Sequence, residues 1–154
     1  MSFCTDNLQN SDDETDLFAH TKRTARRLID IAKKNNIPVT LICDTAHEFS
    51  DDYAQVIIVD KGADSADFRL ANLANANDIV ITQDYGLAAM CLSKRAVVIN
   101  QNGLIYTNDN IDSLLLSRHI AKKIRNSGGR LKGPSKRTRQ QDREFEECLT
   151  SLIK

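Results

Sequence analysis

Short apolar runs alternate with helix-forming segments along this chain of 154 residues. Runs rich in β-branched residues predict strands at residues 39–43, 56–59, 78–82 and 96–99. Between these runs, and after the last of them, apolar residues recur at the three- and four-residue spacing of helices. Because crossover helices connect neighbouring parallel strands, this alternation predicts an α/β protein with an open, mostly parallel sheet flanked by helices.

The helical segments place their apolar residues on single faces. A helix is predicted from Thr21 to the Asn35-Asn36 pair, and a longer one is predicted to end at Gly128-Gly129. The first helix carries Ala25, Leu28, Ile29 and Ala32 on its apolar side, and the last helix of the chain carries Phe145, Cys148, Leu149 and Leu152. The chain has no internal repeat, so we expect residues 21–154 to form a single α/β domain with a basic loop at 128–139 and a C-terminal helix.

Residues 1–20 differ in composition from the rest of the chain. They contain five acidic residues, no basic residue and no sustained apolar period. Such a segment buries too little apolar surface to offset the entropy of ordering it, so we expect an acidic, mobile arm. Its acidic character is also unlike a secretory signal, and no apolar run approaches the roughly 20 residues of a membrane span. We therefore expect a cytoplasmic protein with no membrane partner.

Polar residues that follow two of the predicted strands are candidates for a functional site. Ligands of open α/β sheets bind beyond the carboxyl ends of the strands. Asp64 and Asp67 follow the strand at 56–59, and Asp84 follows the strand at 78–82. Gathered carboxylates suit a hard cation such as Mg²⁺ or Mn²⁺. The alternative is helix capping, with Asp64 and Asp67 as N-cap and N3 residues of one helix and Asp84 as the N-cap of the next.

The charges are distributed unevenly. Before residue 94 there are 15 acidic and 8 basic side chains, and from residue 94 onward there are 6 and 13. A glycine-containing loop gathers five basic residues, which suit phosphate groups of single-stranded RNA or another nucleic acid. They are Arg130, Lys132, Lys136, Arg137 and Arg139. The alternative is a solvated linker between two helices.

Few aromatic residues are present to stack on bases. Tyr53, Tyr85 and Tyr106 are the candidates for surface stacking, so any nucleic-acid binding is expected to rely on the phosphate backbone and to read sequence weakly. The chain has no G-x-S-x-G, no P-loop and no G-x-G-x-x-G motif. The common hydrolase, nucleotide-triphosphatase and dinucleotide-binding classes are therefore excluded.

Three blocks of sequence resemble the bacterial YaiI/YqxD family. They are Gly-Ala-Asp-Ser-Ala-Asp at 62–67, Asn-Asp-Ile-Val-Ile-Thr-Gln-Asp-Tyr-Gly-Leu-Ala at 77–88, and Gly-Gly-Arg-Leu-Lys-Gly-Pro at 128–134 with Asp142, Arg143 and Phe145. With Ile37-Pro38-Val39, the resemblance covers about residues 25–153. It implies a three-layer PIN-like fold, the architecture of many Mg²⁺- or Mn²⁺-dependent ribonucleases. In such a nuclease Asp67 and Asp84 would be catalytic, and Asp64, Asp67 and Asp84 would bind the metal.

The N-terminus departs from this family. Its members usually begin with an apolar strand that runs into Asp-x-Asp-x-Cys-Pro, and this motif is missing here. Extending the alignment backwards without gaps places the strand and motif on residues 17–23, with Phe18 and His20 at the aspartate positions. Neither is a hard oxygen ligand. We therefore expect weak metal binding and low or absent nuclease activity, and the alternative function is a non-catalytic module that binds nucleic acid or protein.

Overall fold

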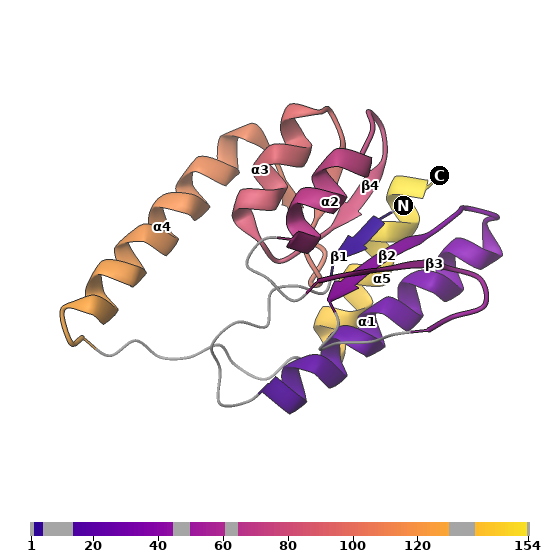
Figure 1. Ribbon diagram of the computed structural model, residues 1–154, viewed down its shortest axis with the longest axis horizontal. Helices are drawn as coiled ribbons and strands as arrows, with labels where there is room; N and C mark the ends of the chain where they lie inside the picture. Colours follow the sequence, from indigo (N-terminus) through magenta and orange to yellow (C-terminus); the bar gives the residue numbers. More distant parts are fainter. Residues whose placement is uncertain (1, 5–13, 45–49, 61–64, 130–137, 154) are drawn as a thin grey trace.

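The computed structural model describes residues 2–4, 14–44, 50–60, 65–129 and 138–153 (Figure 1). Its strands form one six-stranded sheet in the order β3-β2-β1-β4-β5-β6. The first five strands in this order pair in parallel, and β6 pairs antiparallel with β5. The strands are β1 (Ser2–Cys4), β2 (Thr40–Asp44), β3 (Gln55–Val59), β4 (Ile79–Ile81), β5 (Val97–Ile99) and β6 (Ile105–Tyr106). The predicted α/β class and mostly parallel sheet are confirmed.

Helices pack against both faces of the sheet. The helices are α1 (Glu14–Lys34), α2 (Ser65–Leu73), α3 (Tyr85–Ser93), α4 (Asn108–Asn126) and α5 (Arg139–Ile153). One buried cluster joins α2, α3 and the start of α4 to one face of the sheet, and a second cluster joins α1 and α5 to the other face. Alternation along the strands separates the two clusters: Val80 belongs to the first and Ile81 to the second.

The predicted apolar faces of the first and last helices are buried. Ala25, Leu28, Ile29 and Ala32 of α1 are at most 4% exposed, and Phe145 and Leu149 of α5 are fully buried. These six residues belong to one cluster with Leu41 and Ile99 of the sheet. The helical spacing in the sequence therefore predicted which sides of α1 and α5 face the core.

The N-terminal segment differs from the sequence-based expectation. Ser2–Cys4 forms β1 at the centre of the sheet, where Ser2 pairs with Thr40 of β2 and with Val80 of β4. Helix α1 begins at Glu14 rather than Thr21. Residues 2–4 and 14–20 of the expected mobile acidic arm thus have regular secondary structure, and residues 5–13 lie outside the described residues. A three-residue strand is too short to show an apolar period in the sequence. Backbone pairing with strands on both sides defines β1 instead.

The gapless placement of a first strand on residues 17–23 is also wrong, since this segment belongs to α1. Acidic residues such as Glu14 and Asp16 suit the beginning of a helix, where the helix dipole favours negative charge.

The order of the strands in the sheet indicates where a ligand would bind. From β1 the chain continues to β2 and β3 on one side of the sheet, whereas β4, β5 and β6 lie on the other side. The change of direction occurs between β1 and β4, and crevices at such switch points bind ligands beyond the carboxyl ends of the strands. The residues that follow β4 and β5 therefore lie at the edge of the sheet where such a ligand would bind. Within the described ranges, no helix combines the length and the apolar character that crossing a membrane requires.

Candidate functional site

Asp84 lies just beyond the carboxyl end of β4 and caps α3. Its Oδ1 atom accepts a hydrogen bond of 3.0 Å from the backbone N–H of Leu87, and its own backbone N–H donates to Oγ1 of Thr82 at 3.0 Å. Asp84 has the extended backbone of an N-cap residue, with φ −85° and ψ 117°. The capping interpretation of Asp84 is therefore confirmed. A cap fixes the carboxylate in place at the switch point, so it does not exclude a second role.

Arg118 of α4 forms an ion pair with this carboxylate. Its Nη1 atom lies 4.0 Å from Oδ1 of Asp84, and its side chain is 60% exposed while that of Asp84 is 14% exposed. Sequence reasoning missed Arg118, because one basic residue on a helix that also carries several others gives no signal of its contacts. The edge beyond β4 thus carries a fixed anion with an accessible cation beside it.

Two tyrosines lie close together near this carboxylate. The rings of Tyr85 and Tyr106 meet edge to face, with centroids 6.0 Å apart and an interplanar angle of 70°. Burial raises the pKa of the Tyr106 hydroxyl, Tyr85 and Asp84 raise it further, and a hydrogen bond with Asn100 lowers it. The Tyr106 hydroxyl therefore stays neutral at physiological pH.

The structure corrects part of the prediction that three tyrosines are available at the surface to stack on bases. Tyr106 is 2% exposed and belongs to the core, so it offers no face to a base. Tyr53 is partly buried, and its hydroxyl donates to the carbonyl of Ile37 at 2.6 Å. Tyr85 is partly buried against the core as well. Because Leu104, Ile105 and Tyr106 form a continuous apolar run, the sequence alone could not show that Tyr106 points inward.

The side chains of the other two predicted carboxylates are outside the described part of the structure. Asp64 lies outside the described residues, and Asp67 belongs to α2 but its side-chain position is not described. No group of three or more His, Cys, Asp or Glu residues able to hold a metal ion occurs in the part of the chain that the structure describes. Of the three predicted carboxylates, the structure thus describes the side-chain position of Asp84 alone, at the switch point.

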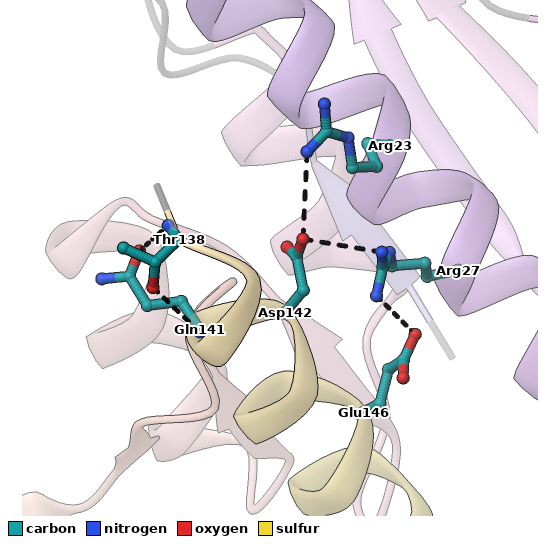
Figure 2. Close-up of polar contacts among 6 residues, drawn as sticks. All are labelled: Arg23, Arg27, Thr138, Gln141, Asp142 and Glu146. Atoms are coloured by element: carbon teal, nitrogen blue, oxygen red, sulfur yellow. Dashed lines mark hydrogen bonds and ion pairs between the residues drawn. The ribbon is translucent and has the colours of Figure 1, made fainter. Parts of the chain in front are cut away.

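The predicted nucleic-acid-binding loop lies mostly outside the described residues. This applies to Arg130, Lys132, Lys136 and Arg137, whereas Arg139 is the exposed first residue of α5. Thr138 and Gln141 form a reciprocal cap at this point: Thr138 N–H donates to Gln141 Oε1 at 2.9 Å, and Gln141 N–H donates to Thr138 Oγ1 at 3.3 Å. The cap fixes the start of α5 (Figure 2).

A buried carboxylate joins this end of α5 to α1. Asp142 is 2% exposed, and its Oδ2 atom lies 3.5 Å from Arg27 Nη2 and 3.9 Å from Arg23 Nη1. Arg27 also donates to Glu146 at 2.7 Å (Figure 2). Asp142 is part of the sequence blocks that resemble known relatives. Neither a role for it nor its partners on α1 could be predicted from the sequence.

Helices α1 and α5 both begin toward the carboxyl edge of the sheet. Helix α1 ends at Lys34, shortly before the start of β2, and Leu152 and Ile153 at the end of α5 line a pocket with Pro38 and Asp78, which precede β2 and β4. The opposite ends of α1 and α5 therefore lie toward the edge that carries Asp84. Arg139 is the exposed first residue of α5, whereas the exposed Arg23 lies near the middle of α1, beside Asp142 in the first turn of α5.

Comparison with known proteins identifies the relatives of the chain. The profile of the family described as "Uncharacterized BCR, YaiI/YqxD family" matches residues 22–154. A UPF0178 protein of Ruminiclostridium cellulolyticum is 54% identical over 123 residues, which is 80% of each chain. Those of Clostridium acetobutylicum and Exiguobacterium sibiricum are 49% and 50% identical, covering 80% and 75% of this chain and 84% and 80% of theirs. No solved structure matches the chain. The resemblance carried by the sequence blocks is thus confirmed, and the chain belongs to the YaiI/YqxD family.

Proposed function

We propose that the chain is a PIN-like protein that binds the phosphate backbone of single-stranded RNA at the carboxyl edge of its sheet. The observation that carries this proposal is the Asp84–Arg118 pair beside the switch point, where an anionic ligand would meet an accessible guanidinium. The sheet order and the helices on both faces are consistent with the three-layer architecture that the family resemblance implies.

Arg118 is suited to a phosphate for reasons of geometry and solvation. A guanidinium has five N–H donors in a planar fork, so one edge can face Asp84 while the rest of the fork receives phosphate oxygens. The Arg118 side chain is 60% exposed, so a phosphate reaches it at small desolvation cost. Asp84 limits the number of arrangements that the Arg118 side chain adopts.

Further basic residues extend the proposed surface along the same edge. Arg23 is 52% exposed and is held beside Asp142, and Arg139 opens α5 directly after the basic loop. The sequence adds Arg130, Lys132, Lys136 and Arg137 in that loop. Contacts of this kind position a nucleic-acid strand without reading its bases, so the proposed binding is weakly sequence-specific.

The described residues do not make a divalent-ion site by themselves. Mg²⁺ requires about six oxygen ligands in near-octahedral geometry. Asp84 is the one carboxylate that the described side chains place at the switch point, and the guanidinium of Arg118 beside it disfavours a cation. We therefore propose that Mg²⁺ or Mn²⁺ binds weakly.

A second candidate is a metal-dependent phosphodiesterase with Asp67 and Asp84 as catalytic residues and Asp64 as a further ligand. The position of Asp84 at the end of β4, next to β1, favours this candidate. It requires Asp64 and Asp67 to converge on Asp84.

Salt-dependent RNA binding tests the main proposal. The affinity for a fluorescent oligouridine, measured by anisotropy, should fall with salt with a slope of about −0.7 per phosphate neutralised. Arg118→Ala with Arg139→Ala should flatten the slope by about one to two units and weaken all sequences alike, and Arg130→Ala with Lys132→Ala should do the same. Lys33→Ala with Lys34→Ala, in the last turn of α1 toward the opposite edge, is the matched control. Undetectable binding at physiological salt, or equal effects of all three double variants, would contradict the proposal.

Calorimetry with Mn²⁺ separates the two candidates. Asp84→Asn is the informative variant, because asparagine also serves as an N-cap and so leaves α3 intact. We expect only weak heats for the unmodified chain and little change in this variant. Sub-micromolar binding that Asp84→Asn abolishes, together with Mn²⁺-dependent RNA cleavage, would instead establish the phosphodiesterase.

A further inference from the structure

Helix α4 presents an exposed apolar stripe along the part that projects from the sheet (Figure 1). Leu116, Ile120 and Ile124 are 58%, 48% and 37% exposed and follow one another at four-residue intervals. The opposite side of α4 packs on the core, where Ile111 is buried and Leu114 and Leu115 are partly buried. The apolar stripe is therefore additional to the face that α4 needs for folding.

Charged residues extend this stripe in a definite order. At 100° per residue, Asp109 falls on the same face before Leu116, and Asp112 and Lys123 flank one side of the stripe, about 80° and 60° from its centre. All three charged side chains are exposed. Along the helix axis, the two acidic residues thus come first, followed by Leu116 and Ile120, and then by Lys123 beside Ile124.

We propose that this face binds the same face of α4 in a second copy of the chain, with the two helices antiparallel. A twofold axis between residues 116 and 120 then packs Leu116 of each copy against Ile120 of the other. In this register Lys123 of one copy lies within about one helical turn, about 5–6 Å along the axis, of Asp109 and Asp112 of the other. The order of charges makes the face self-complementary in this direction.

The same charge order argues against other partners. A nucleic acid or an anionic membrane surface would meet Asp109 and Asp112 on the face together with Lys123. A parallel pair of helices would place like charges opposite each other at both ends. Because each copy contributes only three partly exposed apolar side chains, we expect a weak dimer that forms in the micromolar range or above. This pairing is independent of the proposed RNA binding.

Sedimentation velocity over a concentration series tests the pairing. The full chain should shift from monomer to dimer as its concentration rises to about 1 mM, near the weak limit of specific association. Leu116→Glu with Ile120→Glu should remain monomeric throughout. The control is Phe68→Glu on α2, because Phe68 is also 58% exposed and lies on another helix. A chain that stays monomeric, or a double variant that dimerises as the unmodified chain does, would overturn the proposal.

Charge reversal tests the direction of pairing. Asp112→Lys should weaken the dimer by about tenfold, because each of two symmetric contacts changes from attraction to repulsion. Combining it with Lys123→Asp should restore dimerisation. In a parallel pair the single reversal would replace one like-charge contact by another and leave the affinity unchanged, which would contradict the antiparallel arrangement. Unchanged circular dichroism verifies that these surface variants fold.

Discussion

Arg27 of α1 holds its Nη2 atom 3.5 Å from Oδ2 of Asp142 of α5, whose side chain is only 3% exposed (Figure 2). The two helices cover the same face of the sheet, and this contact joins them at polar positions beside an apolar interface. Asp142 also lies 3.9 Å from Arg23, so two cations compensate one buried carboxylate.

Asp142→Asn should lower the free energy of unfolding by about 2–3 kcal/mol, because removing one partner of a nearly buried charge pair leaves the other incompletely compensated. Glu146→Gln is the matched control. It removes the other carboxylate bound by Arg27, but at a site where the side chains of Glu146 and Arg27 are 40% and 33% exposed. Its expected cost is below about 1 kcal/mol. Urea unfolding at neutral pH measures the free energy of unfolding of both variants. Equal losses in the two variants would contradict the prediction that burial makes the Asp142 ion pair more important than that of Glu146.

Gly103 turns the chain between β5 and β6 with a positive φ of 84°, and a Cβ there would lie 2.7 Å from the carbonyl oxygen of Glu144 in α5. Gly103→Ala should therefore cost about 2–3 kcal/mol, through the left-handed backbone and the displacement of α5. Gly128→Ala is the control, since Gly128 has φ 86° but open space around its Cα. It should cost about 1 kcal/mol. Thermal unfolding of the two variants separates the effect of steric contact from that of backbone strain. Equal losses of stability would show that the contact with Glu144 contributes nothing.

Tyr106 should make the fold sensitive to alkali. Burial, the first cause, raises the pKa of its hydroxyl above the ordinary value of a tyrosine. The unfolded chain then loses this proton near pH 10 while the folded chain keeps it, so stability is retained below about pH 10 and falls above it by roughly 1.4 kcal/mol per pH unit. Tyr106→Phe should remove this part of the decline. Denaturant unfolding from about pH 9 to 11 tests it, and a constant difference between the two proteins would contradict the prediction.

How far the sequence predicts this structure depends on the range of the interactions involved. The strands at 56–59, 78–82 and 96–99 and the buried faces of α1 and α5 were predictable because local periodicity records them. The Asp84 cap was predictable as one of two alternatives, because capping involves residues only three positions apart. Contacts between distant segments were not. Arg118 reaches Asp84 across 34 positions of sequence, and no local pattern indicates that contact.

Removing residues 1–4 provides the strongest test of the N-terminal strand. β1 pairs with β2 on one side and β4 on the other, so its loss would expose two internal strand edges at the centre of the sheet. We expect the truncated chain to lose its cooperative thermal transition, or to melt more than about 10 °C below the full chain, since several kcal/mol of stability are lost. Phe3→Pro should act in the same direction because proline cannot donate a hydrogen bond within a central strand, whereas Phe3→Ile keeps the donor and should cost much less. If the truncated chain melted within a few degrees of the full chain, residues 1–4 would be dispensable and the expectation of a mobile N-terminal arm would be restored.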